Sequence, residues 1–398
     1  MSGKTKVIYV GPYAFPNGGA AARRILGNAL SLRDAGCEVL IGTGELAEGA
    51  KEQDYPVESE YEGFRVVSLG ERTAEKYPKI LKHLIYFNMG VKTIAWLESL
   101  EEKPDVVILY SGYSPFMMRL IPWCKRHGIK FVFDAVEWYD PKSFISGLLS
   151  PYQLNIELAL HYYSKKTDAA IVISSYLQEH YDAKGCQTIL IPPTLDTEKI
   201  EPNLKVPGDH HTLVVSYTGS PGDLFDVYLE AVLRLHEQGE KILFRFAGIK
   251  TEQLLKYPAL TERNIQESLP SILDCRGRTT HEEAIAITKM SDFSLLLRPP
   301  KRYAQAGFPT KIVESLTMGT PVIINITSDL GKYVHDGAEG LICDDYTPES
   351  LVIALKRAMA LSTDEKMKMR QAARAQAEES FDCYRYSERL KGFMKKKS

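Results

Sequence analysis

Short apolar runs alternate with helical patterns along most of the chain, and this alternation restricts the possible folds more than any other feature. Continuous apolar runs predict strands, and the longer periodic segments between them predict helices. In the first half the predicted strands are residues 7–10, 38–41, 64–68, 105–109, 130–133 and 170–173, and the predicted helices are residues 24–35 and 79–100. Strands that alternate with helices pair in parallel, so this half predicts a doubly wound sheet.

The alternation stops in a proline-containing segment and then starts again. Residues 191–211 contain four prolines, which is typical of a linker. The second half predicts strands at residues 213–217, 242–247, 293–297 and 322–324 and helices at residues 224–238, 281–290 and 348–361. A chain of 398 residues is also too long for one ordinary core. We therefore predict an α/β protein with two doubly wound parallel-sheet domains, whose ligands lie beyond the carboxyl ends of the strands.

A short helix near residue 310 carries the most informative motif, Gly307-Phe308-Pro309-Thr310-Lys311-Ile312-Val313-Glu314. Pro309 suits the first helical turn, where its missing N–H is not needed, and Gly319 suits the position after the helix end. Lys311 and Glu314 are three residues apart, so they project from one side of the helix near its N-terminus. Positive charge at a helix N-terminus attracts phosphate, and a carboxylate can accept hydrogen bonds from sugar hydroxyls. This combination predicts a site for a nucleotide-sugar.

A glycine-containing loop follows the first strand of each half. Gly18 and Gly19 let the backbone approach a ligand closely and can direct their N–H groups at phosphate. Their loop does not match G-x-G-x-x-G, so a nicotinamide fingerprint is unsupported, and a flexible connection is the alternative reading. Gly219 lies in the corresponding turn of the second half, which can also cradle phosphate but contains no cation.

Two further segments place charged residues at the carboxyl ends of predicted strands. Glu137 follows the strand at residues 130–133 and can orient or deprotonate a sugar hydroxyl, while Trp138 and Tyr139 can flank a sugar ring. The alternative is a paired loop carboxylate with aromatic side chains packed below it. Arg298 follows the strand at residues 293–297. Its guanidinium can bind phosphate at two points, although a solvated basic loop explains the pattern equally well.

The composition excludes several classes of protein. The net charge of −2 gives no general affinity for nucleic acid. The six cysteines form no C-x-x-C pair and the nine histidines show no metal-ligand spacing, so we expect neither a metal site nor a disulfide framework. No apolar run reaches the length of about 18 residues that spans a membrane, and no secretory signal is evident. We expect a cytoplasmic protein, whose basic C-terminal residues are either a solvated terminus or a peripheral membrane contact.

These segments together resemble the retaining GT-B glycosyltransferases of family 4, also called glycosyltransferase group 1, in the form that carries P-x-K-x-x-E. The resemblance covers nearly the whole chain, and it rests on the order and spacing of the motifs. The matching segments are Gly18-Gly19 with Arg23-Arg24, Ala35-Gly36-Cys37-Glu38-Val39, Ile173-Ser174-Ser175-Tyr176, Ile191-Pro192-Pro193-Thr194-Leu195-Asp196, Gly277-Arg278, Leu297-Arg298-Pro299, and a donor-site signature of Glu314, Gly319, Pro321, Val322, Asp336-Gly337 and Gly340-Leu341.

The resemblance implies a GT-B fold, in which two Rossmann-like domains face each other across a cleft. It implies an acceptor-side domain at residues 1–200, a nucleotide-sugar domain at residues 201–380, and a C-terminal helix at residues 381–398 that returns to the first domain. Taken with the motifs above, we expect Lys311, Arg298 and Glu137 to be catalytic, and we expect the donor-binding residues to be Gly18, Gly19, Gly219, Gly307, Phe308, Pro309, Lys311 and Glu314.

The implied reaction transfers a sugar with retention, and without a metal or a cofactor, from a nucleoside-diphosphate sugar to an acceptor. A UDP- or GDP-sugar is the expected donor, and a saccharide or a lipid-linked saccharide is the expected acceptor. Family members with the P-x-K-x-x-E form often build bacterial surface polysaccharides. The inner face of the cytoplasmic membrane is therefore the expected place of any peripheral contact.

The sequence departs from the family pattern at two places. The first glutamate of the usual E-x7-E motif is replaced by Ala306, and the segment Ser220–Phe225 lacks the usual arginine and lysine. Lys311 is the expected replacement for that basic pair, with Arg298 as the second candidate. The departures leave two alternatives open: a GT-B protein that binds a nucleotide-sugar and assists a partner transferase, and a GT-B epimerase.

Overall fold

The chain divides into two compact units that do not coincide with its two sequence halves. In the computed structural model the described residues are 4–47, 49–51, 54–72, 78, 81, 85–139, 151–208, 211–222, 224–265 and 269–395. Unit 1 comprises Met1–Asp196, Gln305–Phe308 and Cys383–Ser398. Unit 2 comprises Thr197–Ala304 and Pro309–Asp382.

Unit 1 is built on an eight-stranded sheet with the strand order β3-β4-β2-β1-β5-β6-β7-β8. All neighbouring strands are parallel except β3 and β4. The strands are β1 (Lys6–Gly11), β2 (Glu38–Thr43), β3 (Val57–Tyr61), β4 (Phe64–Ser68), β5 (Val106–Tyr110), β6 (Lys130–Ala135), β7 (Ala169–Val172) and β8 (Thr188–Leu190). The six strands predicted in this half are confirmed, whereas β3 and β8 were not predicted.

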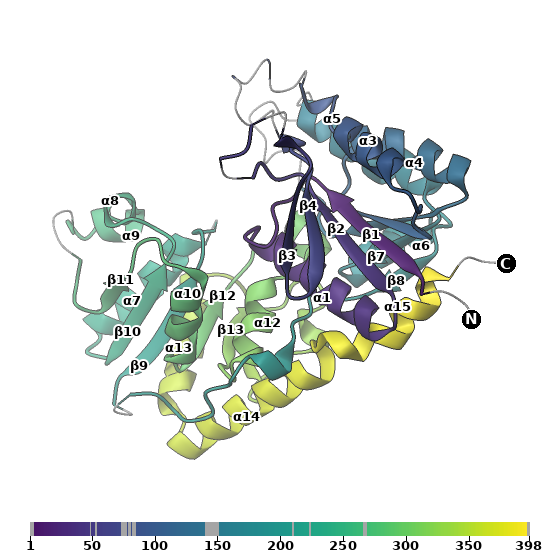
Figure 1. Cartoon of the computed structure of the whole chain (residues 1–398). Helices are drawn as coiled ribbons and strands as arrows, with labels where there is room; N and C mark the ends of the chain where they lie inside the picture. Colours follow the sequence, from purple (N-terminus) through teal and green to yellow (C-terminus); the bar gives the residue numbers. More distant parts are fainter. Residues whose placement is uncertain are drawn as a thin grey trace. The chain divides into compact units, whose positions relative to one another are not determined.

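Helices lie on both sides of this sheet, with α3, α4 and α5 in one group and α1 and α15 in the other (Figure 1). The helices are α1 (Ala20–Asp34), α3 (Val91–Ser99), α4 (Ser114–His127), α5 (Pro151–Leu158), α6 (Ser175–Asp182) and α15 (Ser387–Met394). A π-helical turn, Ala159–Tyr163, continues α5. The helix predicted at residues 79–100 corresponds in its last part to α3, and residues 79–80 and 82–84 lie outside the described residues.

Unit 2 contains a six-stranded, entirely parallel sheet with the strand order β11-β10-β9-β12-β13-β14. Its strands are β9 (Leu213–Thr218), β10 (Ile242–Ala247), β11 (Leu273–Cys275), β12 (Phe293–Leu296), β13 (Val322–Asn325) and β14 (Gly340–Cys343). The order reverses between β9 and β12, and ligands of such sheets bind at this switch point, beyond the carboxyl ends of the strands.

The helices of unit 2 pack in two groups, one formed by α7 and α13 and the other by α10, α12 and α14. The helices are α7 (Phe225–Glu237), α8 (Thr251–Leu254), α9 (Pro258–Thr261), α10 (His281–Lys289), α11 (Arg302–Ala306), α12 (Thr310–Thr317), α13 (Pro348–Ala360) and α14 (Thr363–Ser380). Helix α14 is fixed by Arg370, which is 1% exposed. Its guanidinium donates hydrogen bonds to the carbonyls of Asn203, Lys289 and Ser291.

Helix α12 ends where the sequence predicts. It begins at Thr310, one residue after Pro309, which was expected to lie in its first turn. Gly319 has a φ of 72°, and the N–H groups of Gly319 and Thr320 bond to the carbonyls of Leu316 and Ser315, which is the Schellman arrangement. Pro309 is the residue before the first helical residue and not a member of the first turn. Its missing N–H therefore lies outside the helix altogether.

The boundaries between the units differ from those expected. The first division lies between Asp196 and Thr197, four residues before the expected end of the first domain at residue 200. Residues 383–398 belong to unit 1, where Leu390 and Phe393 of α15 join the hydrophobic core around α1. Gln305–Phe308, expected in the second domain, also groups with unit 1, because Ser174 Oγ donates a 2.6 Å hydrogen bond to the Ala306 carbonyl.

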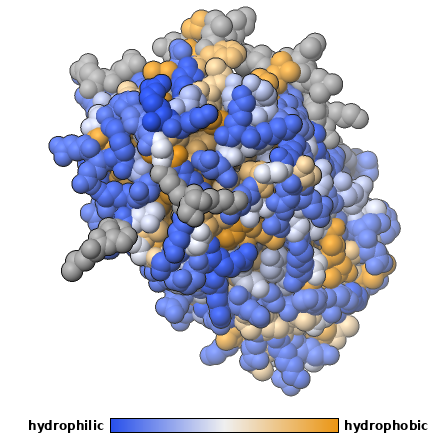
Figure 2. Space-filling view, turned by 90° about the vertical axis from the view of Figure 1, so that its right-hand side faces the viewer, coloured by the Kyte–Doolittle hydropathy of each residue, from blue (hydrophilic) through white to orange (hydrophobic). Residues whose placement is uncertain are grey.

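One face of the molecule is mostly polar. Hydrophilic side chains cover most of the face shown in Figure 2, and hydrophobic side chains occur between them in small groups. Among the helices of the described residues, none has both the length and the apolar character that crossing a membrane requires.

Candidate functional site

Three glycines whose backbones lie against one another follow the neighbouring strands β9, β10 and β11 of unit 2, and the first of them lies at the switch point. Gly219, Gly248 and Gly277 follow β9, β10 and β11, and their φ values are 110°, 109° and 65°. A Cβ atom on Gly248 would lie 2.1 Å from the Gly219 carbonyl oxygen, so no other residue fits there. The Gly248 N–H donates to the Gly277 carbonyl. The Gly219 N–H donates to the Ala247 carbonyl at 3.0 Å, so this amide is hydrogen-bonded within unit 2.

Lys311 lies against this glycine loop. Its Nζ atom donates a 3.1 Å hydrogen bond to Tyr217 Oη and lies 4.2 Å from the centre of the Tyr217 ring. A Cβ atom on Gly219 would lie 2.7 Å from the same Nζ atom. The structure therefore brings together two of the predicted residues, Gly219 and Lys311, and assigns Gly219 the role of leaving room for the ammonium group.

Tyr217, which the sequence did not single out, orients the lysine. Its hydroxyl donates a 2.7 Å hydrogen bond to the Ser220 carbonyl, which leaves the oxygen lone pairs for Lys311. Burial raises the pKa of Tyr217 to about 12, so the phenol stays protonated at neutral pH. A tyrosine at the end of a buried strand is a common packing residue, and no sequence signal distinguishes this one.

The N-terminus of α12 adds to the positive potential around Lys311. The helix has no side-chain N-cap and no acidic residue in its first turn. The positive end of its backbone dipole therefore faces the same region as Lys311. Glu314 follows Lys311 by three residues on α12 and is half-buried. Both predicted residues of this helix thus lie on its first two turns, as their spacing requires.

Arg298 lies just beyond β12, on the other side of the switch point. Its backbone N–H donates to Asn325 Oδ1 at 2.8 Å, and its carbonyl accepts from Asn325 Nδ2 at 2.9 Å. The Arg298 guanidinium donates to the Tyr303 carbonyl at 3.4 Å and lies 5.7 Å from the centre of the Tyr303 ring. Burial lowers the pKa of Arg298, but a guanidinium remains charged in a protein at neutral pH.

A pocket of about 580 Å³ adjoins the glycine loop of unit 2. Ser220, Pro221 and Gly248 form the side of the pocket that belongs to the loop. Tyr257, Lys256 and Arg278 also line it, so it offers an aromatic ring and two cations. A planar, polar group of an anionic ligand fits such a lining.

The loop before α12 contains the remaining predicted residues of this segment. Gly307 is half-buried and Phe308 is 6% exposed, and both belong to unit 1, whereas Pro309 belongs to unit 2. Ala306, which replaces the first glutamate of the family motif, is fully buried. The side chain at this position is therefore a methyl group, which offers no carboxylate for hydrogen bonding.

Gly18 and Gly19 precede α1 in unit 1. Glycine is favoured at these two positions by different structural constraints. A Cβ atom on Gly18 would lie 1.9 Å from the Ala14 carbonyl oxygen, so the loop's own packing requires this residue. Gly19 is the N-cap of α1 with a φ of 62°, and no atom within 4 Å would meet its Cβ. Of the two, Gly19 is therefore the one with open space for a ligand.

Glu137 is exposed in unit 1, beyond the end of β6. Partial removal from water raises the pKa of its carboxyl, and a hydrogen bond with Tyr139 opposes this rise. Trp138 does not flank a sugar ring, because it is only 8% exposed and its ring centre lies 4.3 Å from that of His180. The predicted motif continues to Asp140 and Pro141, which lie outside the described residues.

Unit 1 also contains a buried charge network that the sequence did not predict. Arg24 and Asp134 are 3% and 0% exposed, and their ion pair has an Nη2–Oδ1 distance of 2.8 Å. Tyr9 and Asn28 donate to the same carboxylate, and Arg24 Nη1 donates to the carbonyls of Ile191 and Pro192. The network therefore joins α1, β6 and the segment that leads to unit 2.

The carboxyl ends of β1 and β5 form the switch point of the unit 1 sheet. Ser111, directly after β5, has a φ of 59°, which is a costly backbone conformation for a residue other than glycine.

In the part of the chain that the structure describes, no three His, Cys, Asp or Glu side chains gather as metal ligands.

Both parts of the chain match known families. Residues 19–193 match the family described as glycosyl transferase 4-like domain, and residues 196–376 match the family described as glycosyl transferases group 1. No significant match was found among curated protein sequences.

Several solved structures have the same fold. Sucrose-phosphate synthase from Thermosynechococcus elongatus is similar with a TM-score of 0.75 and 15% identity over 98% of both chains. Anabaena HepE in complex with UDP-glucose has a TM-score of 0.65 and 13% identity over 98% of this chain and 99% of its own. A glycosyltransferase from Rickettsia africae has a TM-score of 0.64 and 16% identity over 99% of this chain and all of its own. With the two parallel-sheet units, these similarities show a GT-B fold.

Proposed function

Because the chain belongs to the group 1 glycosyltransferases of GT-B fold, we propose that it transfers a sugar from a nucleoside-diphosphate sugar to a saccharide or lipid-linked acceptor. The observation that carries this proposal is the position of Lys311. Its ammonium group is held between the Tyr217 ring and Gly219, at the N-terminus of α12 and beside the switch point of unit 2. This arrangement concentrates positive charge where a diphosphate binds in such sheets.

The proposed mechanism retains the configuration at the anomeric carbon. The bond between this carbon and the leaving diphosphate breaks, and the acceptor oxygen bonds to it on the same face of the sugar. The acceptor proton passes to an oxygen of the departing diphosphate. Lys311 and Arg298 stabilise the negative charge that grows on the diphosphate, so the reaction needs neither a metal ion nor the carboxylate pair of a glycosidase.

Other residues would bind the donor and the acceptor. Glu314 accepts hydrogen bonds from the ribose, and the pocket beside Tyr257 and Arg278 holds the base. The backbone of Gly307 and Phe308 contacts the donor sugar in place of the missing glutamate. Gly19 and Glu137 contribute from unit 1, Glu137 by orienting the acceptor hydroxyl. We also propose a role in bacterial surface polysaccharide synthesis, at the inner face of the membrane, because family members with the P-x-K-x-x-E form often have that role.

A second candidate function is a nucleotide-sugar-binding protein with little or no transferase activity. The buried methyl group of Ala306 favours it, because the family glutamate that contacts the donor sugar has no counterpart there. The two candidates agree on donor binding and differ in whether the sugar–phosphate bond is broken.

A thermal-shift screen with UDP-, GDP-, dTDP- and ADP-sugars tests donor binding, on which the two candidate functions agree. A ligand at 100 times its Kd stabilises the native state by about 2.7 kcal/mol, which raises Tm measurably. The protein is then incubated with the stabilising sugar nucleotide, and the products are analysed by chromatography. The products distinguish between the candidate functions. Slow release of free sugar indicates a transferase, an unchanged donor indicates the binding protein, and a changed sugar still attached to its nucleotide indicates an epimerase. The absence of any shift would contradict the proposal.

A further inference from the structure

Lys184, the second residue after α6, is a half-buried lysine whose ammonium group meets uncharged acceptors. Its Nζ atom donates to the Leu160 carbonyl at 3.1 Å, to His161 Nδ1 at 3.0 Å and to His180 Nε2 at 2.5 Å. A ring nitrogen that accepts a hydrogen bond carries no proton, so neither imidazole is charged in this arrangement. Among the described residues, no carboxylate forms an ion pair with Lys184. Its three N–H donors are therefore satisfied without a counter-charge in contact.

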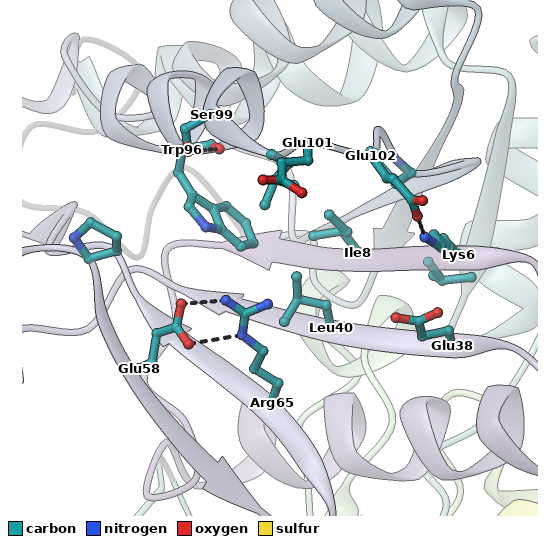
Figure 3. A pocket seen from close by; sticks show the side chains of 14 residues that line it. Lys6, Ile8, Glu38, Leu40, Glu58, Arg65, Trp96, Ser99, Glu101 and Glu102 are labelled. Carbon is teal, nitrogen blue, oxygen red and sulfur yellow. Dashed lines mark hydrogen bonds and ion pairs between the residues drawn. The ribbon is translucent and has the colours of Figure 1, made fainter.

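Lys6 of β1 shows the usual arrangement of a half-buried lysine. It lies at the edge of a pocket of about 490 Å³, and its ammonium group pairs with Glu102 (Figure 3). A carboxylate in contact favours the charged form of a lysine, which has no lone pair for a reaction. At Lys184, removal from water and the charge of nearby Lys165 lower the pKa of the amine. Lys184 therefore loses a proton more easily and becomes a nucleophile.

His161 is oriented as a proton acceptor for this amine. Its other ring nitrogen, Nε2, donates to Glu157 Oε2 at 2.9 Å, so Nδ1 is the unprotonated nitrogen and faces Lys184. The Trp138 ring packs against the imidazole with a distance of 5.5 Å between the ring centres. His161 lies in the π-helical turn Ala159–Tyr163, and such turns occur frequently at functional sites. A nucleophile beside a base that a third group orients is the usual arrangement for covalent chemistry.

We propose that the Lys184 amine is a modification site that an acyl phosphate acylates. The ammonium group first loses one proton to water, which frees the lone pair of the nitrogen. This nitrogen bonds to the carbonyl carbon of the acyl phosphate, and the bond between that carbon and the phosphate oxygen breaks. Phosphate leaves with the electron pair of the broken bond, and a second proton passes from the nitrogen to His161 Nδ1. Glu157 stabilises the imidazolium, which then releases its proton to water.

The charge around Lys184 favours an anionic acyl donor over a neutral one. Lys165 is exposed, and its positive charge acts on Lys184 and attracts the phosphate group of the donor. The product is an uncharged amide, so acylation also removes the repulsion between these two lysines. The modification is independent of the proposed sugar transfer, because it uses neither a sugar nucleotide nor any residue of unit 2.

Acetylation of the folded protein by acetyl phosphate tests this assignment. Samples are taken over time, the lysines that remain free are labelled with deuterated acetic anhydride in denaturant, and mass spectrometry of peptides gives the extent of acetylation at each lysine. Lys184 should react at least about tenfold faster than Lys6 and than Lys356, an exposed lysine of α13, because a positioned base accelerates the reaction. In urea, where no base is positioned, the three lysines should react at similar rates.

The variant His161→Asn separates a base from a hydrogen-bond acceptor. Asparagine keeps an acceptor oxygen for Lys184 but takes up no proton, so acetylation of Lys184 should slow at least about tenfold while that of Lys356 is unchanged. His127→Asn is the matched control, because His127 pairs with Glu98 at 3.5 Å on α4. This variant should acetylate Lys184 at the wild-type rate. The Tm of each variant shows whether the fold is kept.

The pH dependence of the reaction gives a measure that a structural role of Lys184 would not affect. The titratable and charged groups near its amine are Glu157, His161, Lys165, His180 and Tyr181. Burial lowers the pKa of His180 to about 4, so this ring stays uncharged near neutral pH. The lowered pKa of Lys184 means that its acetylation rate should level off at a lower pH in the folded protein than in urea.

Several results would overturn the proposal. If Lys184 in the folded protein reacted no faster than Lys6 and Lys356, the site would not be selective. An unchanged rate at Lys184 in His161→Asn would remove the role of the imidazole as a base. Lys165→Gln should slow acetylation by acetyl phosphate more than acetylation by p-nitrophenyl acetate, a neutral ester. Equal slowing with both reagents would overturn the assignment of an acyl phosphate as the donor.

Discussion

The Lys311 ammonium group donates to the Tyr217 hydroxyl across a distance of 3.1 Å, although the two residues are 94 positions apart in the sequence. Because the tyrosine hydroxyl donates its own proton to the Ser220 carbonyl, its oxygen can only accept from the lysine. The ammonium group is thereby fixed before any substrate arrives. Fixed positive charge stabilises a developing anion without the cost of reorganising the site during the reaction.

Replacing Lys311 by alanine tests this arrangement directly. Loss of one charge-assisted contact costs about 1.5–3 kcal/mol, so turnover with the donor found in the screen should fall at least about tenfold. Lys356→Ala, which removes an exposed lysine on α13, should have wild-type kinetics. Steady-state assays of both variants measure the effect on turnover. An unchanged kcat in Lys311→Ala would exclude this residue from the mechanism.

Gly219→Ala should displace the lysine without removing it. The new Cβ atom would lie 2.7 Å from Lys311 Nζ, and the φ of 110° strains any residue with a Cβ. Gly239→Ala is the matched control, because it has a φ of 85° and nothing within 4 Å of its Cβ. Both variants should lose about 1–2 kcal/mol of stability from backbone strain. Only Gly219→Ala should lose donor affinity in calorimetry, and equal losses in both variants would refute the proposed role of Gly219.

Glu314→Ala should mainly weaken binding of the donor. If its carboxylate accepts hydrogen bonds from ribose hydroxyls, their loss costs about 1.5–3 kcal/mol, or roughly ten- to hundredfold in Kd. Isothermal titration with the complete donor and with its 2′-deoxyribose analogue measures this contribution. The wild type should prefer the complete donor and the variant should not, whereas the same preference in both proteins would place the ribose elsewhere.

Glu71 gives a prediction about stability and pH. This residue is 5% exposed, and burial raises the pKa of its carboxyl above the ordinary value of 4.5, although the Thr93 N–H donates to it at 2.7 Å. The folded protein therefore binds the Glu71 proton more tightly than the unfolded chain does. The resulting contribution to stability is complete below pH 4.5 and is lost as the pH rises through the raised pKa.

Glu71→Gln should consequently be more stable than the wild type at neutral pH, because glutamine keeps an acceptor for Thr93 and carries no charge. The difference in the free energy of unfolding should shrink as the pH falls toward 4.5, where the wild-type carboxyl is also neutral. Urea unfolding of both proteins across this range checks the sign. A difference that does not vary with pH would contradict the assignment.

Asp134→Asn tests whether the buried network of unit 1 is structural. It leaves the Arg24 guanidinium buried without its carboxylate, and such a change costs about 3–5 kcal/mol. We expect a large fall in Tm and little change in donor affinity below the transition. Replacing both residues, as in Arg24→Met/Asp134→Leu, should recover part of the stability. A loss of donor affinity with an unchanged Tm would point to a role in binding.

The sequence predicted most strands because a parallel strand covered on both faces is a continuous apolar run. Strand β3 has no such run, since four of its five residues are exposed at the edge of the sheet. Helix α4 was not predicted, and it contains Pro122 in its interior, a residue that normally interrupts helices. Local patterns therefore predict elements whose burial is regular, and they fail where an element is exposed or tolerates an unfavourable residue.

The site was predictable only where its residues are close in the sequence. Lys311 and Glu314 share one short helix, so their spacing was informative. The contacts of Lys311 with Tyr217 and Gly219, and of Arg24 with Asp134, join segments that are 94 and 110 residues apart. Such pairs depend on strand order, which no local pattern specifies. The functions proposed for Arg298, Glu137 and the glycines remain predictions that binding and kinetic measurements must test.

The placement of α15 in the core of unit 1 bears on how this protein can be divided or recombined. A fragment that stops at Asp196 would lack Leu390 and Phe393, and it would expose the apolar side of α1 that they cover. Chimaeras that exchange unit 2 between related proteins should therefore take residues 197–382 as an insert and leave both ends of the recipient chain in place.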